Sequence, residues 1–223
     1  MKKYIIVYIV ICLFLLACGD KSTNNGGEIV NEETVLTAWK DFREGRYSSA
    51  EKRFNNIKNA EDPSIFLVGY YGLGWTSLKQ RRYQNAKNEF NKFFTLDEDG
   101  IYRPSGTGVT ALEDSIFRNV RAGQLIALNA LGEHSNAINI GSIFNHTGTI
   151  ITNWKFNHDQ KIEIIDMRLF KAISHFAIGG TGNLQQSVNL IKMIDPTFDA
   201  DITTSEGRLL LSKKIEELSF NRL

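Results

Sequence analysis

The chain of 223 residues is poor in cysteine and proline, is nearly neutral, and has no apolar run long enough to cross a membrane. Its two cysteines are Cys12 and Cys18, so the sequence beyond residue 18 excludes both a disulfide scaffold and a thiol nucleophile. A formal net charge of +1 at pH 7 argues against nucleic-acid binding, which needs a concentrated basic surface. The apolar run at residues 4–17 is shorter than the roughly 20 residues of a spanning helix.

The N-terminus instead contains a targeting signal. Lys2 and Lys3 precede the apolar run at residues 4–17, which leads into the sequence LLAC. A cationic start, a short apolar core and a small residue before the cut are typical of a secretory signal peptide. Because a cysteine follows, the segment resembles a bacterial lipoprotein signal. That resemblance implies cleavage after Ala17 and lipid attachment at Cys18.

The signal divides the chain into three segments and predicts where the protein is held. Residues 1–17 are the signal peptide, residues 18–29 a lipidated flexible tether, and residues 30–223 the folded domain. Several acyl chains anchor a protein stably to a membrane face. In the lipoproteins that this signal resembles, an acid after the cysteine favours retention in the inner membrane. Gly19 stands there instead, so we expect a lipid anchor in the outer membrane, facing the periplasm or the cell surface.

The folded domain contains an internal repeat with an offset of 36 residues. Residues of the same type recur at that offset: Trp39, Tyr47, Ala50 and Phe54 match Trp75, Tyr83, Ala86 and Phe90. Periods of about 20–50 residues are typical of stacked structural units. The pattern resembles the tetratricopeptide repeat family, with weaker units around Gly132 and Gly182. The resemblance implies an all-α solenoid of about four helix pairs plus a C-terminal capping helix.

Local signals predict several helix ends. Asp62 followed by Pro63 predicts a helix start, and Ser48 with Glu51 predicts a capping box for the second helix. The last helix is expected to carry an apolar stripe that covers the open end of the solenoid. The residues of this stripe are Leu209, Leu210, Ile215 and Leu218.

The repeat spacing widens after the second unit, which implies two insertions. They comprise residues 97–109 and residues 146–161. Both lie between helix pairs, so both are predicted to be loops on the edge of the solenoid. Long ordered loops often carry function.

Neither insertion contains a recognisable catalytic or metal-binding pattern. The Gly-rich segment at residues 105–108 lacks the preceding strand and the Lys-Ser/Thr pair of a phosphate-binding loop. His146, His158 and Asp159 have a spacing that matches no established set of metal ligands. We therefore predict a protein without enzymatic activity, metal or cofactor, with an enzyme sited in the insertions as the weakest alternative.

The family resemblance implies a concave groove lined by the first helix of each pair. In the first unit it would present Trp39, Phe42 and Arg43, and in the second Tyr71, Trp75 and Lys79. These six residues, called the groove strip below, combine aromatic and cationic side chains. Such a strip suits an extended peptide with acidic groups, or a glycan stacked on indole. The alternative is that the rings are packed in the core, which is common for aromatic stripes at helical spacing.

These observations predict a membrane-anchored, non-enzymatic scaffold that binds an envelope protein or peptide in its groove. In its length, lipid anchor and first two units, the chain also resembles the small helical-repeat lipoproteins of the outer-membrane β-barrel assembly machinery. The alternative function is a glycan-binding accessory lipoprotein of the nutrient-uptake type. Exposure of Trp39 and Trp75, and convergence of His146, His158 and Asp159, would discriminate among these hypotheses.

Overall fold

The computed structural model describes residues 30–97, 115–145 and 153–220, and these ranges are mostly helical. The all-α class is therefore confirmed in its coarse form, with the addition of one small β-hairpin. The predicted signal peptide, Cys18, the tether and residues 98–109 of the first insertion lie outside the described ranges. Within those ranges, no helix has the length and apolar character to cross a membrane.

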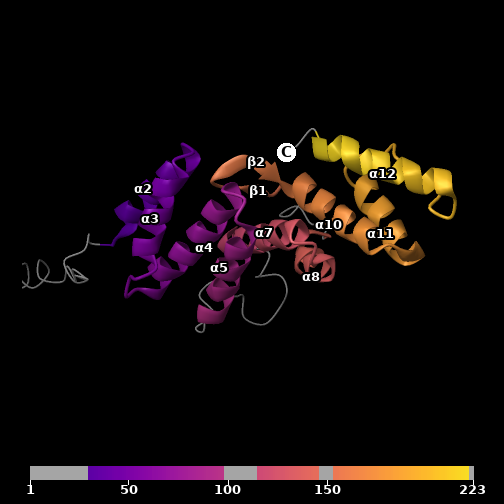
Figure 1. Cartoon of the computed structure of the whole chain (residues 1–223). Coiled ribbons are helices and arrows are strands. Elements are labelled where there is room, and N and C mark those ends of the chain that lie inside the picture. The colour runs from indigo at the N-terminus through magenta and orange to yellow at the C-terminus, as the bar shows by residue number, and fades with distance from the viewer. Residues whose placement is uncertain (1–29, 98–114, 146–152, 221–223) are drawn as a thin grey trace, which may run out of the picture.

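The first four described helices pack in sequence, each on the one before it (Figure 1). They are α2 (Glu32–Arg43), α3 (Tyr47–Ile57), α4 (Pro63–Lys79) and α5 (Tyr83–Leu96). Helices α2 and α4, the first members of the two pairs, also contact each other. Asp62 caps α4 as predicted, with its carboxylate accepting from the Ser64 amide at 2.8 Å.

The second half of the chain continues the elongated body and then turns back toward its start (Figure 1). It contains α7 (Ser115–Ala130), α8 (His134–Ile140), the 3-10 helix η1 (Gly141–Asn145), β1 (Lys155–Phe156), β2 (Asp159–Glu163), α10 (Ile164–Ile178), α11 (Gly180–Lys192) and α12 (Ser205–Phe220). Strands β1 and β2 are antiparallel, and β2 leads directly into α10.

Three helix pairs are joined by the same turn. A residue with positive φ ends the first helix of each pair: Gly45 at 74°, Arg81 at 60° and Gly132 at 73°. In each turn the residue after the positive-φ residue donates its backbone amide to the carbonyl five residues before it, as Arg46 does to Asp41 at 2.9 Å. The carbonyl of the donating residue, Arg46 in the first turn, then accepts a hydrogen bond from the following helix, here from the Ala50 amide. The Ser48–Glu51 capping box was therefore a wrong prediction, because α3 begins at Tyr47 without a side-chain cap.

Glycines set the distance between neighbouring helices. A Cβ placed on Gly72 would lie 2.2 Å from the ring of Phe54, and one on Gly74 would lie 2.4 Å from the ring of Phe90. Gly123 of α7 approaches the other side of Phe90 with the same closeness, at 2.2 Å. The phenylalanines of α3 and α5 thus fill notches in the helices that flank them.

The buried apolar residues form two clusters. The larger runs from Ala38 to Met167, and the smaller runs from Leu169 to Ile215 across α10, α11 and α12. The predicted stripe of the last helix is only partly correct. Ile215 is buried and Leu218 packs against the smaller cluster, whereas Leu209 and Leu210 are exposed. Adjacent residues are about 100° apart around a helix, and it is Leu211 that shares the buried face with Ile215.

Candidate functional site

The structure brings the six residues of the groove strip together on α2 and α4. Their aromatic side chains are almost fully buried: Trp39 is 4%, Phe42 2%, Tyr71 2% and Trp75 1% exposed. Arg43 is exposed and Lys79 is half-buried. The four rings therefore belong to the buried core, with a cation near the end of each helix.

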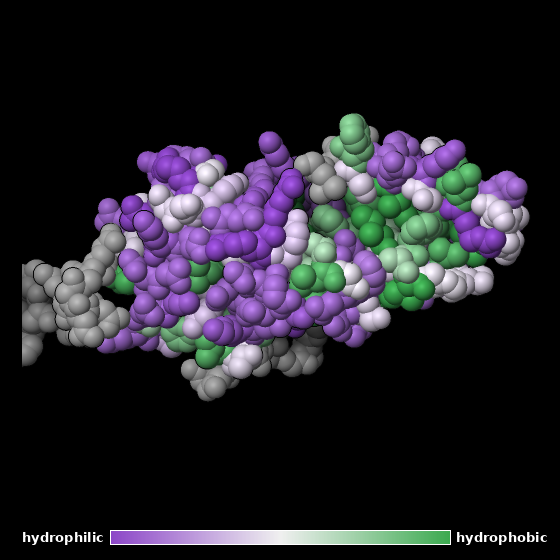
Figure 2. Space-filling model, viewed as in Figure 1, coloured by the Kyte–Doolittle hydropathy of each residue, from purple (hydrophilic) through white to green (hydrophobic). Residues whose placement is uncertain are grey.

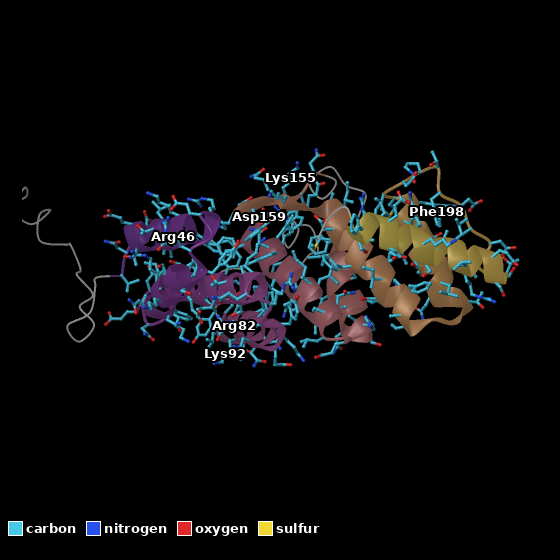
Figure 3. All side chains as sticks on the ribbon, turned by 45° about the horizontal axis from the view of Figure 1, so that its top comes forward. Arg46, Arg82, Lys92, Lys155, Asp159 and Phe198 are labelled. Carbon is cyan, nitrogen blue, oxygen red and sulfur yellow. The ribbon has the colours of Figure 1, made fainter. Side chains whose placement is uncertain are left out.

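The β-hairpin covers the groove strip. It comprises residues 155–163 and so includes the end of the second insertion, residues 146–161, which was predicted to be a loop on the edge of the solenoid. That prediction was wrong for the described residues 153–161, and residues 146–152 lie outside the described ranges. Asn157 and His158 form the turn between the strands, and Phe156 pairs with Asp159 across it. The segment from residue 156 to residue 159 is called the hairpin tip below. Asp159, labelled in Figure 3, lies where the hairpin meets the helices of the first half of the chain.

Phe156 fills an aromatic slot formed by the strip. Its side chain is completely buried and its ring stacks on Trp75, with 3.9 Å between centroids and 16° between planes. The rings of Trp39, Phe42 and Tyr71 meet it edge-on at 6.2–6.4 Å. Edge-to-face and offset-stacked contacts of this kind add to the free energy of burial. The slot is thus complementary to one aromatic side chain.

His158 occupies the second position on the strip. Its imidazole lies flat on the Trp39 indole, with 3.6 Å between centroids and 2° between planes. Burial, together with the nearby Arg43 guanidinium, lowers the pKa of His158 to about 4. His158 Nδ1 lies 3.4 Å from Nη1 of Arg43, a group that only donates hydrogen bonds. The imidazole is therefore neutral at pH 7, with Nδ1 as the acceptor.

Asp159 occupies the third position, on α4. Its Oδ2 accepts from the Lys79 ammonium at 2.5 Å, and both side chains are partly shielded from solvent. A charge-assisted hydrogen bond with this degree of shielding is stronger than an exposed surface pair. Each cation of the strip thus faces a different residue of the hairpin tip.

Trp154 fixes the base of the hairpin through a contact that the sequence pattern did not indicate. Its indole Nε1 donates to Asn119 Oδ1 at 3.1 Å, and the Asn119 amide donates to the Tyr71 hydroxyl at 3.0 Å. Asn119 of α7 therefore joins the hairpin to the groove strip. It lies in the second turn of α7, 35 residues before Trp154, so no local signal marks it.

A second buried polar group lies between α7, α8 and α10. The Asn129 amide donates to Ser174 Oγ at 2.9 Å, and His134 Nδ1 lies 3.4 Å from the same oxygen. A serine beside a histidine is the beginning of a nucleophile-and-base arrangement. Ser174 has no exposed surface, however, so no substrate reaches its hydroxyl. These bonds satisfy polar groups inside a helix contact.

The side chains of His158 and Asp159 do not converge on one site, because His158 contacts Arg43 and Asp159 pairs with Lys79. A cation beside each residue disfavours a metal ion there. His146 lies outside the described ranges. Among the residues that the structure describes, no three His, Cys, Asp or Glu side chains form a metal-binding group. Comparison with known proteins identifies no relative: no family model, no curated protein and no solved structure matches the chain.

Proposed function

We propose that this protein is a lipid-anchored, non-enzymatic scaffold of the bacterial cell envelope that binds a protein partner in the groove of α2 and α4. One observation carries the proposal: the groove strip already holds a polypeptide segment, the hairpin tip, through ring stacking and one ion pair. A surface with these contacts is chemically suited to an aromatic and acidic segment of a second protein.

The finer fold assignment belongs to the same proposal. A tetratricopeptide-like solenoid is supported by the 36-residue repeat and by the identical turns at Gly45, Arg81 and Gly132. The α10–α11 pair is joined differently, through Gly179 and Gly180, both with φ of 73°. We therefore propose three repeat units of the same design, followed by a divergent pair and α12.

A protein partner fits the groove better than a glycan does. In this structure one face of Trp39 is covered by His158 and one face of Trp75 by Phe156. The two covering side chains belong to a peptide turn, which supports a polypeptide rather than a glycan as the partner of the strip.

The membrane anchor is proposed from the signal sequence alone. Replacing Cys18 with Ser removes the atom that would carry the lipid. The variant is expected to leave the outer-membrane fraction and to be recovered as a soluble or uncleaved protein. Continued fractionation of the Cys18→Ser protein with outer membranes would contradict the anchor.

Photocrosslinking in native membranes tests the partner. A photoreactive residue replaces Arg43, which is exposed at the edge of the groove, and the matched control carries it at Lys52, which is exposed on α3. We expect a discrete crosslinked protein from position 43 that is absent from position 52. Identical products from both positions, or none from either, would overturn the proposed function.

A further inference from the structure

The occupant of the groove is a tight turn, whereas the sequence predicted an extended peptide. Phe156, His158 and Asp159 occupy the first, third and fourth positions of a four-residue turn, and all three contact α2 or α4. The groove is therefore complementary to a turn with an aromatic residue at its first position and an acid at its fourth. A flat ring at the third position adds the stack on Trp39.

Side chains alone attach the hairpin tip to the groove. In the described part of the chain, no backbone hydrogen bond joins β1 or β2 to α2 or α4. The polar attachments to these helices are the Lys79–Asp159 pair and the Arg43–His158 contact. Because the backbone of the tip takes no part, another turn with the same side chains satisfies the same groove.

The hairpin tip leaves part of the binding capacity of the groove unused. Trp75 Nε1 is buried and donates to no acceptor among the described residues. Arg43 faces a neutral imidazole and has no carboxylate partner within the described ranges. An unsatisfied buried donor is unfavourable, and a guanidinium binds a carboxylate more strongly than an imidazole. A partner with a carbonyl or carboxylate near these groups would supply acceptors that the tip does not.

We propose that the partner binds through a tight turn with an aromatic first residue and an acidic fourth residue, and that it displaces the hairpin tip to do so. This inference rests on the proposed function, since it names the chemistry of the partner at the same groove. The hairpin is then a built-in competitor. It stands in for the partner when the partner is absent and keeps the aromatic slot out of water.

Competition within one chain lowers the apparent affinity of the groove for a partner. The hairpin belongs to the same chain as the groove, so the competition is intramolecular, and the apparent affinity of a partner falls in proportion to the fraction of open grooves. Weakening the hairpin tip without changing α2 or α4 must therefore strengthen the binding of an external turn. A groove that is permanent core would not show this behaviour.

A cyclic peptide of residues 153–163 is the probe for this competition. It is labelled with a fluorophore and titrated with the purified full chain and with the Asp159→Lys chain, in which the tip is repelled by Lys79. We expect the Asp159→Lys chain to bind the peptide about ten-fold more tightly than the unchanged chain. The matched control peptide carries Phe156→Ala and is expected to lose binding to both.

A charge exchange tests contact at Lys79 directly. The Lys79→Glu chain should prefer the Asp159→Lys peptide, whereas a chain with Lys79 intact should prefer the original peptide. This reversal of preference requires that the fourth residue of the bound turn meets position 79. Circular dichroism and a melting curve establish that each variant is folded, and His158→Ala replaces Asp159→Lys if that variant is not.

Two results would overturn the inference: a folded Asp159→Lys chain that binds the peptide no better than the original, or an unchanged peptide preference in Lys79→Glu. Adding excess cyclic peptide to the position-43 crosslinking experiment separates this failure from failure of the proposed function. A crosslinked partner that the peptide does not displace refutes the turn chemistry alone. Peptide binding without any crosslinked envelope protein refutes the proposed function alone.

Discussion

The two ends of the molecule bury their apolar residues in different ways. Around α2–α5 the core is rich in aromatic rings and closed, and its largest side chains, including Trp75, Tyr71 and Phe90, are almost fully buried. Around α10–α12 the buried cluster consists mainly of Leu, Ile and Val, and it leaves Leu209 57%, Leu210 48% and Phe220 87% exposed. On the face that Figure 2 shows, the first end is mostly hydrophilic, whereas the second has many hydrophobic residues among hydrophilic ones. The first end does expose Leu36 and Leu96.

The difference follows from how many sides of a helix are covered. Helix α4 is packed against α2, α3, α5 and α7 and receives the hairpin tip as well, so its residues 71–78 are all buried. Helix α12 contacts α10 and α11 and buries only Gly207, Leu211 and Ile215. A stacked helical structure is most stable where a unit has neighbours on both sides and least stable at its last helix. Substitutions at the two ends are therefore expected to have unequal effects.

The largest effect is expected for Trp75→Ala. The indole is 1% exposed and stacks on Phe156, so truncation leaves a large cavity and removes one wall of the slot. We expect a loss of about 3–5 kcal/mol in the free energy of unfolding, measured by chemical denaturation. Phe220→Ala in α12 is the matched control and should cost little, because that ring is 87% exposed. Equal losses for the two variants would refute the comparison of the two ends.

Gly123→Ala should destabilise the first region through overpacking. The added Cβ would lie 2.2 Å from the ring of Phe90, which is itself held against Gly74. We expect a cost of about 1–3 kcal/mol in a urea titration. Gly182→Ala in α11 is the control, since nothing lies within 4 Å of its added Cβ, and it should stabilise by roughly 0.5–1 kcal/mol as helix propensity dictates. Opposite signs for two identical substitutions separate packing from propensity.

Acidification should loosen the hairpin tip, and it should also weaken the α10–α11 contact, because burial lowers the pKa of His175 of α10 as it does that of His158. The pKa of His158 is lowered to about 4. The neutral imidazole therefore contributes its full share to the stability of the docked tip above the ordinary pKa of 6.5, and this share is lost as the pH falls toward 4. Arg43 and Lys79, the cations on the helices beneath the tip, oppose a second positive charge there. The cost of protonation is on the order of 2 kcal/mol.

Hydrogen exchange of the hairpin between pH 7 and pH 4, corrected for the intrinsic pH dependence of exchange, measures this loosening. Residues 155–163 are expected to lose protection, and His158→Gln should abolish most of the change. A hairpin whose protection is constant across this range would show that His158 does not govern docking.

The smallest effect is expected for Arg81→Gly, which should be stabilising. Arg81 has φ of 60°, the conformation that Gly45 and Gly132 adopt in the other two turns. Replacing a non-glycine residue in the left-handed conformation by glycine raises the free energy of unfolding by up to about 1 kcal/mol, and the entropy of glycine in the unfolded chain offsets part of this gain. Gly45→Ala is the reciprocal control and should destabilise by a similar amount. Thermal melts of both variants check whether the three turns are equivalent.

The repeat could be predicted from the sequence because it rests on local spacing. The offset from Trp39 to Trp75 indicates two equivalent helices, and this suffices to bring the groove strip together. The hairpin could not be predicted. Its strands are short, Asn157-His158 is not a typical turn pair, and its position depends on Phe156 meeting rings far away in the sequence. The sequence left open whether the rings were groove or core, and the structure places them in the buried core, covered by a segment that is distant in the sequence.

The hairpin tip also affects the order in which the chain folds and unfolds. A stack of helix pairs with contacts only between neighbours is one-dimensional, and it can unravel from either end without disturbing the middle. The Arg43–His158 and Lys79–Asp159 contacts close loops of 115 and 80 residues. Closing such loops is slow, so docking of the tip is expected late in folding, after the local pairs have formed. Once these contacts have formed, α2 and α4 are joined through the hairpin to α10, and these helices are expected to resist unfolding by force as one unit.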